Sequence, residues 1–146
     1  MSFEPEVIRI AVAVVKTEDG VAITWNKNWK RFVLPMTKIG RGLEEETAEE
    51  AAVRALAEVA GTPCQVESGK PSHEMRQLQL SGRDGELKDY QFVLVPVRTH
   101  PDFTSTPVAD HSVVMAPVEK LQVGEYKPLS SSVKPIIDEC VSLGLV

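Results

Sequence analysis

Runs of apolar and β-branched residues separated by polar turns predict several strands in the first part of the chain. Val7 to Lys16 is mostly apolar, and the turn-like Glu18-Asp19-Gly20 leads into Val21 to Trp25, so a hairpin is expected to open the chain. A further short strand is expected within Trp29 to Pro35, with the proline ending it. This opening pattern favours a sheet before any helix.

The later part of the chain also has apolar runs separated by polar turns, and its last predicted element is a helix. Strand-like runs occur at Gln65 to Glu67, Glu74 to Leu80, Tyr90 to Val97 and Ser112 to Met115. The turn-like Gly82 to Gly85 separates the second and third of these runs. Ser132 to Leu143 has the spacing of an amphipathic helix, with Pro135 in its first turn, where proline is tolerated.

One helix has strong boundary signals. Thr47 is followed three residues later by Glu50, which is the signature of a capping box, and Gly61 is a suitable C-terminal stop. The helix is therefore expected from Ala48 to about Ala60. Within it, positions 55, 58 and 59 are three and four residues apart, so their side chains are expected to share a face.

The segment from Gly40 to Gly61 resembles the Nudix box. In that family the box reads Gly-x5-Glu-x7-Arg-Glu-aliphatic-x-Glu-Glu-x-Gly-aliphatic. The positions that match are Gly40, Glu46, Arg54, Leu56, Glu58 and Gly61. The positions that depart are Ala55 and Val59, where the family has glutamates, and Thr62, where it has an aliphatic residue.

The resemblance implies a fold and a set of roles. The fold would be of the α/β (α+β) class, a mixed β-sheet sandwiched between helices, with residues 1–146 forming a single Nudix-like domain. In the family, Mg²⁺ or Mn²⁺ supports hydrolysis of nucleoside diphosphate derivatives. The roles carried over are Glu58 as metal ligand, Glu46 and Arg54 as a brace for the helix, and Lys38, Gly40 and Arg41 as phosphate-binding residues. The family's usual Leu-Pro-Gly-Gly-Lys is Leu34-Pro35-Met36-Thr37-Lys38 here, and the connection to Gly40 is three residues longer, which indicates a reshaped phosphate loop.

The departures from the box favour weak or lost catalysis. Magnesium needs oxygen ligands in near-octahedral geometry, and Glu58 is the single carboxylate left among the three expected on that helix face. The first hypothesis is therefore a Nudix-fold protein with a degenerate metal site and a ligand-binding or interaction role. The second is an active hydrolase, in which Glu44, Glu45 or a later acidic residue replaces the missing ligands.

Ordinary structural roles explain several of the same residues. Glu50, Arg54 and Glu58 have the spacing of a surface ion-pair ladder, and Gly40 could serve a flexible turn. Scattered histidines at positions 73, 100 and 111 show no metal-site spacing, although His111 precedes a strand that could border a pocket. Trp25 and Trp29 could stack on a base, but core packing is the more common use of such residues.

Composition narrows the choice of partner. The net charge of -5 disfavours binding to a nucleic-acid polymer through a basic face, so a nucleoside diphosphate derivative is the expected ligand, and a homodimer is left open. No apolar run is long enough for a membrane span and no secretory signal is visible. With Cys64 and Cys140 far apart in sequence, a cytoplasmic protein with reduced thiols is expected.

Overall fold

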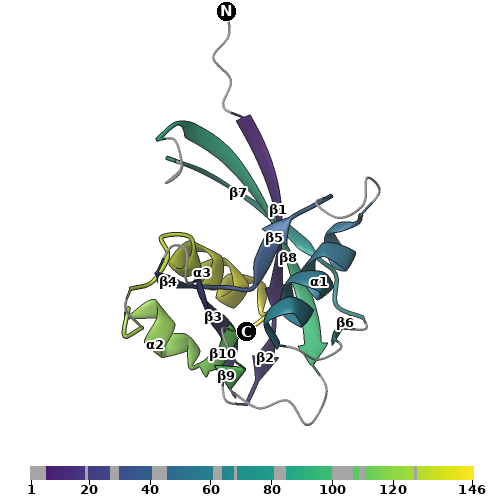
Figure 1. Ribbon diagram of the computed structural model, residues 1–146, viewed down its shortest axis with the longest axis vertical. Helices are drawn as coiled ribbons and strands as arrows, with labels where there is room; N and C mark the ends of the chain where they lie inside the picture. Colours follow the sequence, from purple (N-terminus) through teal and green to yellow (C-terminus); the bar gives the residue numbers. More distant parts are fainter. Residues whose placement is uncertain are drawn as a thin grey trace, which may run out of the picture.

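A computed structural model describes residues 6–18, 20–26, 30–40, 46–60, 64–67, 69–80, 85–99, 107–108, 111–126 and 128–146 (Figure 1). The strands are β1 (Glu6–Val14), β2 (Lys16–Thr17), β3 (Gly20–Asn26), β4 (Arg31–Val33), β5 (Met36–Lys38), β6 (Cys64–Val66), β7 (His73–Leu80), β8 (Leu87–Thr99), β9 (Pro107–Val108) and β10 (His111–Ala116). The helices are α1 (Ala48–Ala60), α2 (Val118–Gln122) and α3 (Val133–Leu143). No helix among the described residues is long and apolar enough to cross a membrane.

The first sheet is built around two long parallel strands. β1 and β8 pair in parallel from Glu6 opposite Lys88 to Val14 opposite Pro96. β5 joins the other edge of β1 in antiparallel register, and both β7 and β6 pair antiparallel with β8. The sheet is therefore mixed, and β1 and β8 are its centre.

The second sheet is antiparallel throughout the described ladder. β3 pairs with β10 along one edge and with β2 and β4 along the other, and β9 pairs with β10. The two sheets meet near Val15, where the chain leaves β1, and the Val15 carbonyl accepts a hydrogen bond of 3.1 Å from the Ala22 N–H.

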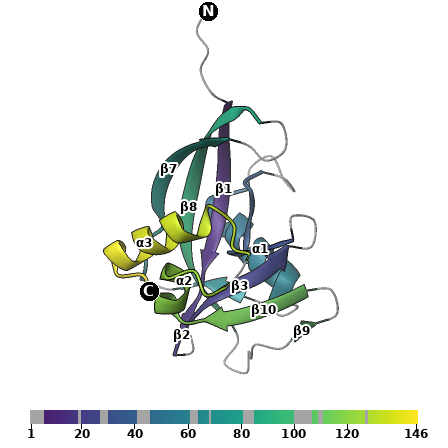
Figure 2. The same cartoon turned by 90° about the vertical axis from the view of Figure 1, so that its left-hand side faces the viewer.

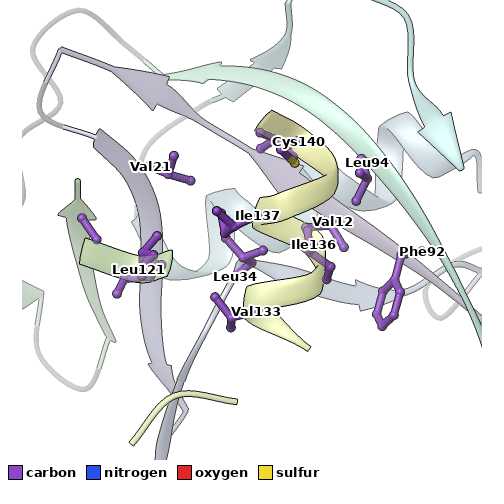
Figure 3. Packing of buried hydrophobic residues seen from close by; sticks show 13 residues of the cluster. Val12, Val21, Leu34, Phe92, Leu94, Leu121, Val133, Ile136, Ile137 and Cys140 are labelled. Carbon is purple, nitrogen blue, oxygen red and sulfur yellow. The ribbon is translucent and has the colours of Figure 1, made fainter. Parts of the chain in front are cut away.

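Helices cover both sides of the first sheet because its central strands are apolar on both faces. Ala11 and Ala13 of β1 belong to the core cluster with α1, whereas Val12 and Val14 belong to the cluster with α3. Figure 2 shows α1 and α3 on opposite sides of β1 and β8, and Figure 3 shows the α3 cluster from close by. The expected fold class, a mixed sheet between helices, is confirmed.

The predicted opening hairpin is mostly wrong. Only the two residues of β2 pair with the start of β3, whereas β1 lies in the other sheet. Both edges of β1 are occupied, by β5 and β8, so neither edge is left for β3. The sequence pattern identified strand residues correctly but could not identify their partners.

The stretch after Pro35 also differs from expectation. Met36–Lys38 forms strand β5 opposite Ile10–Val12, instead of belonging to a lengthened loop. Pro35 ends β4 as predicted, but its carbonyl accepts a hydrogen bond of 2.8 Å from the Ala13 N–H. The proline therefore stands where the chain passes from the second sheet into the first.

Most of the other predicted elements are present. α1 has the predicted bounds, and α3 begins after Ser132 and ends at Leu143, with Pro135 in its first turn. The predicted strands correspond to β6, β7, β8 and β10, each differing by a few residues at its ends. Gly61 and most of the Gly82 to Gly85 turn lie outside the described residues.

Candidate functional site

The start of α1 is fixed by the reciprocal cap that the sequence predicted. The Glu50 N–H donates to Thr47 Oγ1 at 3.1 Å, and the Thr47 N–H donates to Glu50 Oε1 at 3.4 Å. Two N–H groups that have no partner within the helix are thereby satisfied. The cap fixes the residue at which α1 begins.

Glu46, just before this cap, joins the preceding loop to the middle of the helix. Its Oε2 accepts from Arg54 Nε at 2.9 Å, and its Oε1 accepts from Arg54 Nη2 at 2.9 Å. Oε1 also accepts the Gly40 N–H at 3.0 Å, while Arg54 Nη2 reaches the Lys38 carbonyl at 3.4 Å. This bidentate ion pair, which we call the Glu46–Arg54 brace, connects the end of β5 to α1.

The brace keeps both of its groups charged. The Glu46 side chain is only 5% exposed, and the hydrogen bonds from Arg54, aided by the Gly40 N–H, lower the pKa of Glu46 below its ordinary value. The same pairing with Glu46 raises the pKa of Arg54. A charge-assisted bidentate pair of this kind has a defined geometry, so it positions the loop as well as neutralising the buried carboxylate.

Positions 55, 58 and 59, which the helix spacing placed on one face, have different surroundings. Ala55 is 4% exposed, and Val59 packs against the core cluster beneath α1. The Glu58 side chain is 63% exposed and its Oε1 lies 3.6 Å from Arg54 Nη1. Where the family pattern has three carboxylates, this chain has two apolar side chains directed to the core and one carboxylate beside an arginine.

These residues do not fit a metal centre of the family type. Divalent ions of the magnesium kind are held by carboxylate and carbonyl oxygens, usually with water and substrate phosphate completing the shell. Within the described parts of the chain, no three His, Cys, Asp or Glu side chains are grouped so that they could hold an ion. Glu58 alone offers one carboxylate, and a cation already lies beside it.

The phosphate-binding residues suggested by the sequence have mixed outcomes. Lys38 lies exposed at the end of β5, so its ammonium faces solvent. The Gly40 N–H donates to Glu46, which gives this amide a partner inside the protein. Gly40 has a φ of 84°, a left-handed conformation that favours glycine, so this residue has a backbone role. Arg41, Glu44 and Glu45 lie outside the described residues.

The aromatic and histidine candidates that the structure describes, Trp25, His73 and His111, lie in strands β3, β7 and β10. Trp25 packs edge-to-face against Phe32 at 5.0 Å between ring centroids, which agrees with the packing role weighed above. His73 begins β7 and His111 begins β10. His100 and Trp29 lie outside the described residues.

Besides the Gly40–Glu46 hydrogen bond, sequence reasoning missed two contacts that shape the site. Arg54 is held by the Lys38 carbonyl, a contact that could be foreseen only if Met36–Lys38 had been recognised as a strand. Ser72 Oγ donates to Glu49 Oε1 at 3.0 Å, which joins α1 to the residue before β7. Neither contact has a local signal, because each depends on elements that are far apart in sequence.

Comparisons with known proteins agree on the fold. No protein-family model and no curated protein matches the sequence. Among solved structures, the MutT Nudix hydrolase from Burkholderia pseudomallei is 14% identical with a TM-score of 0.59, covering 91% of this chain and 97% of that one. A Nudix-family hydrolase from Clostridium perfringens is 15% identical with a TM-score of 0.58, covering 92% and 96%. The Ap4A hydrolase of C. elegans is 14% identical with a TM-score of 0.57, covering 96% and 99%. Together with the strand order and the helices on both sides of the sheet, these likenesses show that the chain has the Nudix fold.

Proposed function

We propose that this chain is a Nudix-fold protein whose metal-dependent hydrolysis is weak or lost, and that it acts by binding a ligand or a partner. One observation carries the proposal: at the two box positions where relatives have glutamates, Ala55 and Val59 pack towards the core. The remaining carboxylate, that of Glu58, lies beside the Arg54 guanidinium.

The loss of two carboxylates weakens the binding of divalent cations at α1, because too little negative charge remains. A diphosphate is itself anionic, so the protein must supply several oxygens to hold divalent cations against it in a defined place. Glu58 supplies one anionic group, and Arg54 Nη1 at 3.6 Å already offsets part of that charge. The local field at α1 therefore attracts a cation much less than three clustered carboxylates would.

The scaffold around the missing ligands is retained. The Glu46–Arg54 brace and the Thr47–Glu50 cap hold the end of β5 and the start of α1 in place. Lys38 is exposed at this junction, so one cation for a phosphate-bearing ligand lies there among the described residues. A nucleoside diphosphate derivative is the ligand class that this arrangement suits, bound without efficient cleavage.

The exposed position of Glu58 favours one alternative function. Because the Glu58 side chain is 63% exposed, it could hold one ion that arrives together with a pyrophosphate-containing substrate. The chain would then be an active Mg²⁺- or Mn²⁺-dependent hydrolase of nucleoside diphosphate derivatives. In that case Glu58→Gln would abolish turnover, while the fold would remain intact.

A hydrolysis screen separates the two functions. We expect the wild-type chain to show no robust turnover of any member of a library of nucleoside diphosphate derivatives, with either Mg²⁺ or Mn²⁺. The same library is tested for binding by the shift in thermal unfolding, with Lys38→Ala as the variant expected to weaken binding. Metal-dependent turnover that disappears in Glu58→Gln would establish the hydrolase instead.

The Ala55→Glu, Val59→Glu double variant is the matched comparison. It restores the carboxylates of the family pattern on an otherwise unchanged scaffold. Folding is checked first by circular dichroism, because position 55 is buried. A gain of turnover in a folded double variant would locate the deficit of the wild type at these two positions.

A further inference from the structure

Among the described residues, β7 is the longest strand with an edge that pairs with no other strand. β7 is eight residues long, whereas the other strands at sheet edges, which are β2, β4, β5, β6 and β9, have two or three residues each among the described parts of the chain. An edge strand presents a row of N–H and C=O groups that can pair with another strand. Short length is one of the usual protections, and β7 lacks it.

Proline and a bulge, two other usual protections of an edge, are absent from β7, although the strand carries the charged Glu74 and Arg76. Its sequence, His-Glu-Met-Arg-Gln-Leu-Gln-Leu, contains neither proline nor lysine. Its pairing with β8 runs from His73 opposite Leu94 to Leu80 opposite Leu87 without a skipped residue, so no bulge bends it away. The outer edge of β7 is regular enough to accept another strand.

Exposed apolar side chains lie around Asp89 at the end of the sheet where β1 and β8 begin. This end of the sheet projects beyond the helices (Figure 1). Leu78 is 60% exposed and Leu80 is 68% exposed. Leu80 is paired with Leu87, and both Leu78 and Val7 are paired with Asp89, so the four apolar side chains share one face of the sheet. We call Val7, Leu78, Leu80 and Leu87 the tip patch.

The charges along the edge suit an identical partner. Between positions 76 and 80, Arg76 is the one charged residue, and it forms an ion pair with Asp89 of its own chain. Two copies of a chain with a net charge of -5 repel each other over most of their surfaces, but not along this locally neutral edge. An acidic or basic peptide would gain no countercharge here.

We propose that two copies of this chain associate through antiparallel pairing of their β7 strands, with Leu78 on the twofold axis. Leu78 then lies opposite Leu78 of the second copy, and Leu80 lies opposite the aliphatic part of Arg76 of that copy. On the other face Gln77 lies opposite Gln79. The two tip patches merge into one, and the two sheets become continuous across the axis.

The test is the state of association as a function of concentration. A small β7–β7 interface predicts a weak dimer, with a dissociation constant of about 1 to 100 µM. Sedimentation velocity should therefore cover protein concentrations of about 1 to 500 µM. We expect Leu78→Lys to raise the dissociation constant at least about tenfold, because it places two cations opposite each other on the axis. The matched control is Val123→Lys, which makes the same change at a residue that is 73% exposed and far from β7 in sequence.

A cross-linking measurement tests the register and remains valid if Leu78→Lys folds poorly. In a Cys64→Ala background, Leu78→Cys should form a disulfide-linked dimer on mild oxidation, because the axis brings the two side chains together, whereas Val123→Cys should not. A protein that stays monomeric over the whole range, a dimer that Leu78→Lys leaves unchanged, or equal cross-linking of both cysteine variants would overturn the proposal.

Discussion

Gly20→Ala is expected to lower the free energy of unfolding by about 3 to 5 kcal/mol. Gly20 begins β3 and has a φ of 131°, a conformation that side-chain-bearing residues rarely adopt. A Cβ there would lie 2.7 Å from the Pro117 nitrogen and still closer to the Ala116 carbonyl. Both are backbone atoms at the end of β10, so they cannot rotate away as a flexible side chain could, and the β3–β10 ladder must shift.

Gly124→Ala is the control that separates the cost of the steric overlap from the cost of the positive φ. Gly124 has a φ of 74° but nothing within 4 Å of an added Cβ, so only the backbone strain remains. We expect a loss of about 1 kcal/mol at this position. Chemical denaturation of both variants gives the difference directly, and equal small losses would show that β10 does not approach Gly20 as closely as described.

Arg54→Ala is expected to destabilise the protein strongly at neutral pH and to uncouple the Gly40 loop from α1. The variant leaves the Glu46 carboxylate, which is 5% exposed, without its bidentate partner. Removing one member of this partly buried ion pair is worse than never having had the pair, because a carboxylate remains without its partner. Arg9→Ala is the control, since the Arg9–Glu74 pair is exposed on both sides and should contribute little.

The effect of Arg54→Ala should depend on pH in a defined direction. Because the brace lowers the pKa of Glu46 below its ordinary value, it stabilises the folded state at pH values above that ordinary value, and this contribution is lost as the pH falls through the lowered pKa. The wild type and Arg54→Ala should therefore converge in stability on acidification. Thermal unfolding at a series of pH values measures this, and a constant gap down to strongly acidic pH would contradict the assigned role of Glu46.

Local signals in the sequence were sufficient to predict α1 and α3. The Thr47–Glu50 box fixes the start of α1 through contacts three residues apart, and the amphipathic pattern of Ser132 to Leu143 identifies α3. Such signals depend on neighbours in the chain, so they can be read without knowing the fold.

The sheet topology could not be predicted in the same way. β1 pairs with β8, about eighty residues later, and the two form a parallel pair that no turn signal announces. β5 is only three residues long and follows a proline, so its pattern resembles that of a loop. Strand identity is therefore visible in the sequence, but strand partners depend on distant parts of the chain.

In the candidate site, too, local features could be predicted from the sequence, whereas contacts between distant residues could not. The resemblance to the box implied that Glu46 and Arg54 brace the helix, and in the structure the two side chains form an ion pair with each other. The spacing did not reveal that the Gly40 N–H is used by Glu46, because that bond depends on the path of the loop after β5. It also placed Ala55, Glu58 and Val59 on one face, whereas in the structure Ala55 is buried, Val59 packs against the core cluster and Glu58 is exposed.

The most direct test of the central claim is a titration with Mn²⁺, with the bound ions counted by electron paramagnetic resonance. The claim is that α1 lacks the carboxylates needed to assemble a metal centre. We expect at most one weakly bound ion per chain in the wild type, and tighter binding in a folded Ala55→Glu, Val59→Glu variant. Two or more tightly bound ions in the wild type, lost in Glu58→Gln, would contradict this account.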